Sequence, residues 1–94
     1  MVMISYNEAI DIEVMELLSD LAITNYTKIV GTYGKGQSSG THLGDDIWPG
    51  RNNLLYISCT SAEAAQLVSG IKELRKKLGK EGIKAFILPI EEVT

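Results

Sequence analysis

The fold is decided most clearly by residues 53–78, NLLYISCTSAEAAQLVSGIKELRKKL, which join a strand pattern to a helix pattern. Most of the first seven of these residues are apolar, and they include the aromatic Tyr56 and the β-branched Ile57, as is typical of a strand. Thr60 and Glu63 then have the spacing of a capping box, and apolar side chains recur at helical intervals as far as Leu78. The stretch therefore predicts a strand over 53–59 and a second helix of the chain directly after it.

The rest of the chain supplies the same kinds of element. Residues 1–6 predict a strand, Asn7 is a suitable helix cap, and an apolar stripe at helical spacing follows it. Residues 24–33 predict another strand, and residues 85–88 a last one that ends at a proline. The order βαββαβ predicts an α+β, ferredoxin-like fold in one domain over residues 1–94, with a four-stranded antiparallel sheet and two helices on one face.

Composition limits the classes of function. With 94 residues, 45% of them hydrophobic and 22% charged, the chain predicts a single globular domain. A formal net charge of -3 disfavours nucleic-acid binding, because such affinity comes from cations that neutralise phosphates. The single cysteine, Cys59, favours the cytoplasm, and the absence of any apolar stretch near the ~18 residues of a membrane span argues against membrane insertion.

The strands carry apolar side chains on both faces, although helices can cover only one face of such a sheet. Leu54 and Leu55 fall on opposite faces of the third strand, and Phe86 and Ile87 on opposite faces of the fourth. An exposed apolar sheet face is a liability for a monomer, so we expect it to pack against further copies of the chain.

The order of elements and a glycine-rich segment over residues 34–51 together resemble the PII (nitrogen regulatory P-II) signalling family, and in particular its divergent PII-like members. The sequence segments that carry the resemblance are ITNYTK (23–28), GKG (34–36), HLG (42–44), IWPG (47–50), NN (52–53) and GIKAFILP (82–89).

The resemblance implies a regulator rather than an enzyme. It implies a homotrimer whose sheets face inward, with small-ligand sites in the clefts between subunits, for an adenine nucleotide or a metabolic anion. Residues 34–51 would signal ligand binding to a partner protein. The positions that would contact the ligand are Lys28, Gly34, Lys35, Gly36, His42, Trp48 and Arg51, with Lys28 and Arg51 as additional positive charge. Glycine favours this role because it allows close approach of the backbone to an anion.

Several alternatives remain open from the sequence. A trimeric metal-binding protein of the CutA type has the same element order, and His42, Asp45 and Asp46 could then hold a divalent metal. The glycines could serve only the turns of a hairpin loop, and Trp48 could anchor that loop on a neighbouring subunit rather than contact a ligand. An amino-acid-binding ACT-type module, an RNA-recognition domain and a small dimeric enzyme also share the order of elements.

Overall fold

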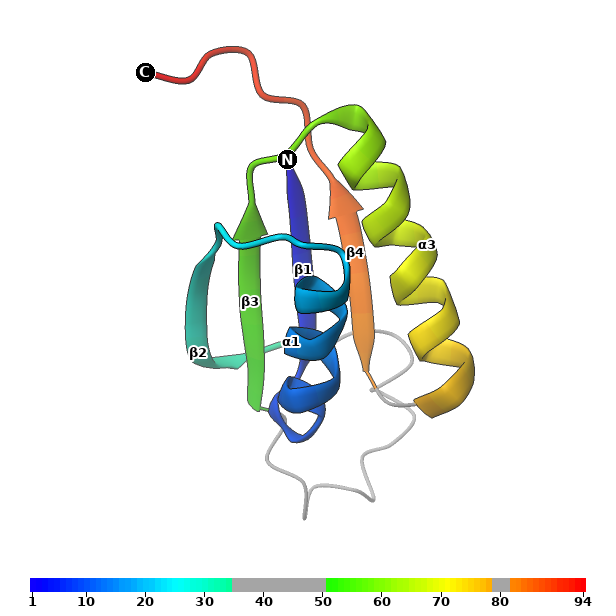
Figure 1. The fold of residues 1–94 in the computed structure, drawn as a ribbon. Helices are drawn as coiled ribbons and strands as arrows, with labels where there is room; N and C mark the ends of the chain where they lie inside the picture. Colours follow the sequence, from blue (N-terminus) through cyan, green and yellow to red (C-terminus); the bar gives the residue numbers. More distant parts are fainter. Residues whose placement is uncertain (35–50, 79–81) are drawn as a thin grey trace.

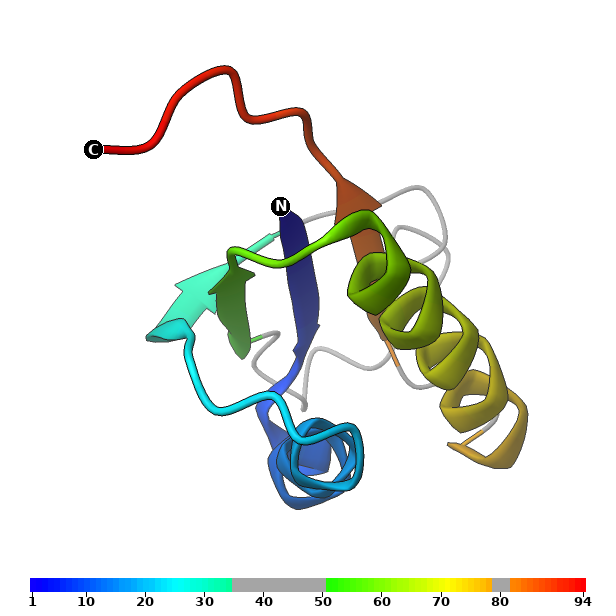
Figure 2. The same cartoon turned by 45° about the horizontal axis from the view of Figure 1, so that its top comes forward.

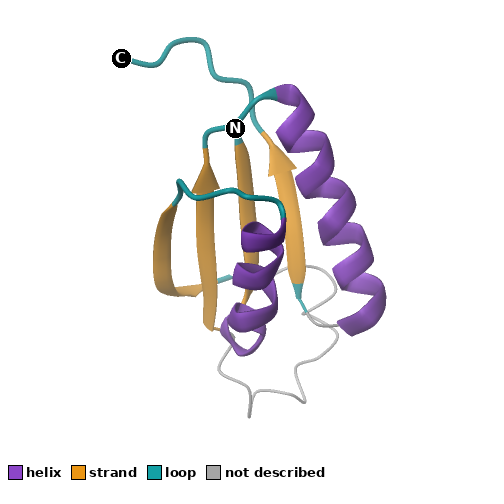
Figure 3. Cartoon of the chain, viewed as in Figure 1, coloured by secondary structure: helices purple, strands orange, loops and turns teal. Residues whose placement is uncertain are grey.

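The computed structural model describes residues 1–34, 51–78 and 82–94 and has the predicted α+β architecture (Figure 1). In chain order the elements are β1 (Val2–Asn7), the short 3-10 helix η1 (Glu8–Ile10), α1 (Asp11–Asp20), β2 (Thr27–Tyr33), β3 (Arg51–Ile57), α3 (Ser61–Leu78) and β4 (Ile83–Ile87). The four strands form one antiparallel sheet in the order β2-β3-β1-β4 (Figure 3). This is the ferredoxin-like order, with β1 and β3 at the centre of the sheet.

Both helices lie on the same side of the sheet, as predicted (Figure 2). Alternate residues of the two central strands point toward them, which is why Ile4 and Leu55 are fully buried. The residues that build this core are Val2, Ile4, Tyr6, Ile10, Val14, Leu18, Ile23, Leu55, Ile57, Ala64, Leu67, Ile71 and Ile83. The helices therefore use the apolar stripes that the sequence indicated.

The opposite face of the sheet carries no helix and is apolar, as the strand patterns predicted. Met3 lies between Tyr56 of β3 and Phe86 of β4 in the strand register. Ile29 of β2 pairs with Leu54, and the side chains of Ile29 and Phe86 are 44% and 42% exposed. Large apolar groups are thus left in contact with solvent on this face of the isolated chain.

The ends of the second, third and fourth strands differ from the sequence prediction. The fourth spans Ile83–Ile87 instead of residues 85–88, because pairing of Tyr6 with Ile83 extends its start. The second strand begins at Thr27 instead of residue 24, because α1 is followed by Ala22 with a φ of 57° and then by a non-helical link. The third strand starts at Arg51 and ends at Ile57, two residues earlier at each end than predicted. Strand pairing explains both limits, since β2 pairs Tyr33 with Arg51 and β1 pairs Val2 with Ile57.

Two local features shape β2 and the start of α3. Gly31 interrupts the pairing of β2 with β3 and has a φ of +69°, a conformation that glycine adopts at little cost. The capping box at the start of α3 is present as predicted, because the Thr60 amide donates to Glu63 Oε1 at 2.9 Å and the Glu63 amide to Thr60 Oγ1 at 3.1 Å. In the described part of the chain, neither helix has the length and apolar composition needed to cross a membrane.

Candidate functional site

The described residues include three of the predicted ligand-binding positions, Lys28, Gly34 and Arg51. Lys28 lies on β2 and Gly34 directly follows this strand, while Arg51 is the first residue of β3. Gly34 and Arg51 therefore directly flank segment 35–50, whereas Lys28 lies near the start of β2 and pairs with Leu55 in the middle of β3. The other predicted positions, Lys35, Gly36, His42, Asp45, Asp46 and Trp48, lie outside the described residues, so their roles stay predictions.

Lys28 belongs to a polar cluster that the sequence patterns did not predict. Its ammonium lies 2.6 Å from Oδ1 of Asp11, the first residue of α1. The same oxygen accepts a hydrogen bond from the Tyr6 hydroxyl at 2.6 Å and one from Asn53 Nδ2 at 3.3 Å. One carboxylate oxygen thereby joins the ends of β1 and β3, the edge strand β2 and the first turn of α1. We call Tyr6, Asp11, Lys28 and Asn53 the Asp11 cluster.

The strand register explains why these groups meet. Tyr6 and Asn53 are directly opposite each other in β1 and β3, and both point to the helix-covered side. Lys28 is paired with Leu55, which is two residues after Asn53 in β3 and points to the same side. A polar Asn53 among inward positions that are otherwise apolar is the signal in the sequence that could have identified the cluster.

One atom of the cluster is left without a partner. Asn53 is only 5% exposed, and its Oδ1 has no hydrogen-bond partner among the described residues. A buried acceptor without a donor costs about 1–3 kcal/mol, so such atoms are uncommon in folded proteins and often mark a site with a function.

The cluster also changes the titration of its members. Burial first, and the hydrogen bond to Asp11 second, raise the pKa of Tyr6 far above its usual value, so this hydroxyl stays a neutral donor. Partial burial opposes ionisation of Asp11, but the hydrogen bonds from Lys28 and Tyr6 and the charge of Lys28 outweigh it. The pKa of Asp11 is therefore lowered, and the carboxylate is charged at neutral pH.

Arg51 has a looser acidic partner. Its Nε lies 3.7 Å from Oε1 of Glu8, and the two side chains are 49% and 44% exposed. Lys28 and Arg51 are thus each near a carboxylate, the first in the opening turn of α1 and the second in η1. An exposed pair at this distance contributes little to stability, so Arg51 can exchange Glu8 for another anion.

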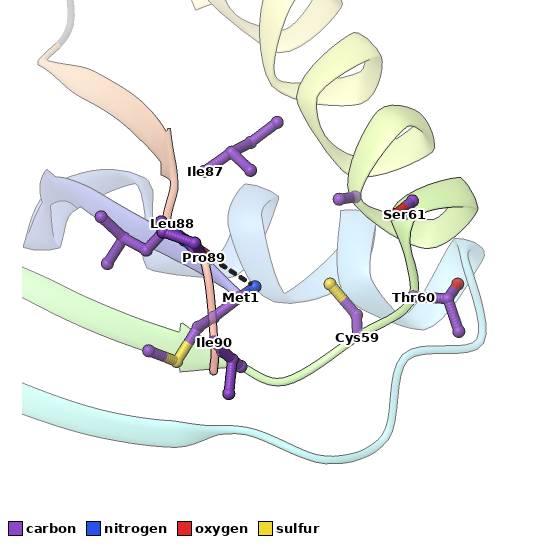
Figure 4. A pocket seen from close by; sticks show the side chains of 9 residues that line it. Met1, Cys59, Thr60, Ser61, Ile87, Leu88, Pro89 and Ile90 are labelled. Atoms are coloured by element: carbon purple, nitrogen blue, oxygen red, sulfur yellow. Dashed lines mark hydrogen bonds between the residues drawn. The ribbon is translucent and has the colours of Figure 1, made fainter. Parts of the chain in front are cut away.

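A separate cleft of about 300 Å³ lies between the start of α3 and the end of β4 (Figure 4). Its wall includes the Cys59 side chain, and at its edge the N-terminal ammonium of Met1 donates to the Leu88 carbonyl at 2.9 Å. The remaining lining residues are Thr60, Ser61, Ala64, Ile87, Pro89 and Ile90. The lining carries no charged side chain, so the cleft offers less to an anion than the residues around segment 35–50.

The described residues bring together no set of three histidine, cysteine, aspartate or glutamate side chains that could hold a metal ion. The candidate metal ligands His42, Asp45 and Asp46 all fall in segment 35–50, so the structure does not test them.

No family model and no curated protein matches the sequence significantly. Several solved structures match the fold, and two of them are aligned over 90% of this chain. One is a PII-like signalling protein of Thermus thermophilus, with a TM-score of 0.63, 18% identity and 77% of its own chain covered.

The second is CPII, a nitrogen regulatory PII-like protein of Thiomonas intermedia, with a TM-score of 0.67, 15% identity and 78% of its chain covered. The chain has the fold of the PII-like signalling proteins. The structure of CPII contains ADP, AMP and bicarbonate. The fold that the sequence resemblance implied is thus confirmed, at a level of identity that a sequence comparison alone does not detect.

Proposed function

We propose that the protein is a PII-like regulatory protein that binds a small ligand and signals its presence to a partner protein. The ligand is an adenine nucleotide or a metabolic anion, and the signal passes through residues 34–51. The observation that carries the proposal is the likeness of nearly the whole chain to CPII, whose structure holds ADP, AMP and bicarbonate. Because both similar structures are described as PII-like proteins, one of them as a signalling protein, the proposal is ligand binding rather than catalysis.

The charges near segment 35–50 support an anionic ligand. Lys28 and Arg51 stand on the two strands that enter and leave this segment. The Lys28 ammonium is paired with Asp11 at 2.6 Å, whereas the half-exposed Arg51 has its acidic partner 3.7 Å away. Phosphate groups and bicarbonate are attracted by such cations, and glycines such as Gly34 let backbone amides approach an anion. The ligand site we propose lies at this end of the sheet, with Lys35, Gly36, His42 and Trp48 as further contacts.

The open sheet face supports assembly into a homotrimer. Ile29 and Phe86 leave a large part of their apolar surface exposed in the isolated chain, and Met3 lies between Phe86 and Tyr56 in the same sheet. Burial of this face between copies removes apolar area from water, at about 25 cal/mol per Å². In the proposed trimer the three sheets face one another and the ligand sites lie in the clefts between subunits.

Thermal unfolding tests the ligand. Metal-stripped protein is heated with ATP, ADP, AMP, bicarbonate or a divalent cation, each in large excess. A ligand present at about 100 times its Kd adds about 2.7 kcal/mol to the free energy of unfolding, which raises Tm by several degrees. A rise with an adenine nucleotide or bicarbonate is the expected result. A rise with divalent cations alone would contradict the proposal and favour a metal-binding protein instead.

A further inference from the structure

The ion pair between Lys28 and Asp11 has the features of a contact that can open without disturbing the fold around it. The two side chains are 24% and 33% exposed, so water and ligands reach them. Lys28 lies on the edge strand β2, which pairs on one side only, with β3. Its ammonium is carried on a flexible four-carbon chain and can turn toward another acceptor.

Asp11 keeps other donors when the lysine leaves. The Tyr6 hydroxyl at 2.6 Å and Asn53 Nδ2 at 3.3 Å donate to the same Oδ1. Tyr6 and Asn53 are 1% and 5% exposed, so these two donors are held in place by the core. The carboxylate therefore remains in its position and hydrogen-bonded whether or not Lys28 is bound to it.

From this geometry we propose that Asp11 competes with the ligand for the Lys28 ammonium. Asp11 holds this ammonium in the free protein and releases it to a phosphoryl group of the bound ligand. The inference rests on the proposed function, because it takes the ligand site to lie near Lys28. Asp11 is here a positioning residue that sets how strongly an anion must attract Lys28 in order to bind.

The competition selects the class of ligand. A carboxylate or bicarbonate carries a single negative charge, as Asp11 does, so exchange of one for the other at Lys28 brings no net gain. A terminal phosphoryl group carries a charge of about −1.5 to −2 at neutral pH and three acceptor oxygens. The site therefore favours a nucleotide with a terminal phosphate over a carboxylate ligand.

The test measures the affinity of ADP and of ATP by isothermal titration calorimetry in the full chain and in four variants. Asp11→Asn removes the competing charge and keeps an acceptor for Tyr6 and Asn53. Lys28→Met removes the cation, and the double variant removes both. Glu13→Gln is the matched control, because it neutralises another acid of the first turn of the same helix. Asp11→Ser serves as a second charge-free variant if Asp11→Asn does not fold, as judged by circular dichroism.

We expect Asp11→Asn to bind ADP about two- to fivefold more tightly than the unchanged protein, the range set by a partly exposed ion pair. Lys28→Met should bind at least about tenfold more weakly, because a charged hydrogen bond to the ligand is lost. In the Lys28→Met background Asp11→Asn should have no further effect, and Glu13→Gln should leave the affinity unchanged. A purely structural role of Asp11 would not produce tighter binding that depends on Lys28.

The inference is overturned if the unchanged protein binds ADP or ATP but Asp11→Asn binds it equally or more weakly. It is also overturned if Glu13→Gln strengthens binding as much as Asp11→Asn, since the effect is then one of total charge. Failure of the unchanged protein to bind ADP and ATP, while it binds bicarbonate, would overturn this inference and leave the proposed function intact. Failure to bind ADP, ATP, AMP and bicarbonate alike would contradict the proposed function as well.

Discussion

Truncation of Asp11 to alanine is expected to destabilise the protein far more than truncation of a neighbouring acid. Asp11→Ala leaves the Tyr6 hydroxyl and Asn53 Nδ2 without their acceptor, in residues that are 1% and 5% exposed. Each buried donor without an acceptor costs about 1–3 kcal/mol, and the partly exposed pair with Lys28 adds less than about 1 kcal/mol. Because water can enter the space of a side chain that is 33% exposed, we take the lower half of this range and expect a loss of about 2–4 kcal/mol.

The assay is equilibrium unfolding in urea at a fixed protein concentration, because the stability of the proposed trimer would depend on concentration. Glu13→Ala is the control, since Glu13 lies in the same first turn and has the same favourable position relative to the helix dipole. It should cost about 0.5 kcal/mol or less. Asp11→Asn, which keeps an acceptor, should cost about 1 kcal/mol. The reasoning is refuted if Asp11→Ala costs no more than Glu13→Ala.

The same cluster predicts a dependence on pH. The pKa of Asp11 is lowered in the folded protein from its ordinary value of 3.8, so its contribution is complete well above this value and is lost as the pH falls through the folded pKa. The unfolding free energy of the unchanged protein should thus decrease more steeply below about pH 4 than that of Asp11→Asn. Parallel curves for the two proteins would contradict the charged network at Asp11.

Three further predictions concern the packing and the assembly. Thr60→Ala removes the hydroxyl that caps α3 and should cost about 1 kcal/mol in urea unfolding, whereas no loss would mean that the cap is unimportant. A Cβ on Gly70 would lie 2.6 Å from Leu17 Cδ1. Gly70→Ala should therefore lower the free energy of unfolding of the unchanged protein by about 1 kcal/mol, but raise that of Leu17→Ala by a similar amount. Equal effects in the two backgrounds would refute this contact. Phe86→Glu on the open sheet face should lower the mass measured by light scattering from that of three chains of 10.3 kDa to that of one. The control Ile12→Glu, at a residue of α1 that is 70% exposed, should leave the mass unchanged. A trimer in both variants would place the interface elsewhere.

Regular elements could be predicted from the sequence because local patterns specify them. The capping box of Thr60 and Glu63 and the apolar stripe after it identify α3 and its burial without any knowledge of the sheet. The strand ends were less accurate, because they depend on pairing with residues far away in the sequence. The pairing of Asn7 with Asn52, for example, extends the third strand to residues that have no strand pattern of their own.

Asn53 is the one member of the Asp11 cluster that the sequence could have marked, and local patterns could not predict the cluster as a whole, because its four residues come from four elements. Asp11 alone fits a first helical turn, where an acid suits the helix dipole, and Lys28 alone is a surface cation. Only the strand register brings Tyr6 opposite Asn53 and turns Lys28 toward the helix side. The assignment of Lys28 to positive charge near segment 35–50 still holds as a prediction, but its acidic partner is a result of the structure.

A crystal structure of the protein grown with ADP tests the central claim most directly. The account predicts a homotrimer with ADP in the cleft between subunits beside segment 35–50, with the Lys28 ammonium on a phosphate oxygen and Asp11 still bound by Tyr6 and Asn53. A structure without a trimer, or with ADP bound away from Lys28 and the Lys28–Asp11 pair intact, would contradict it.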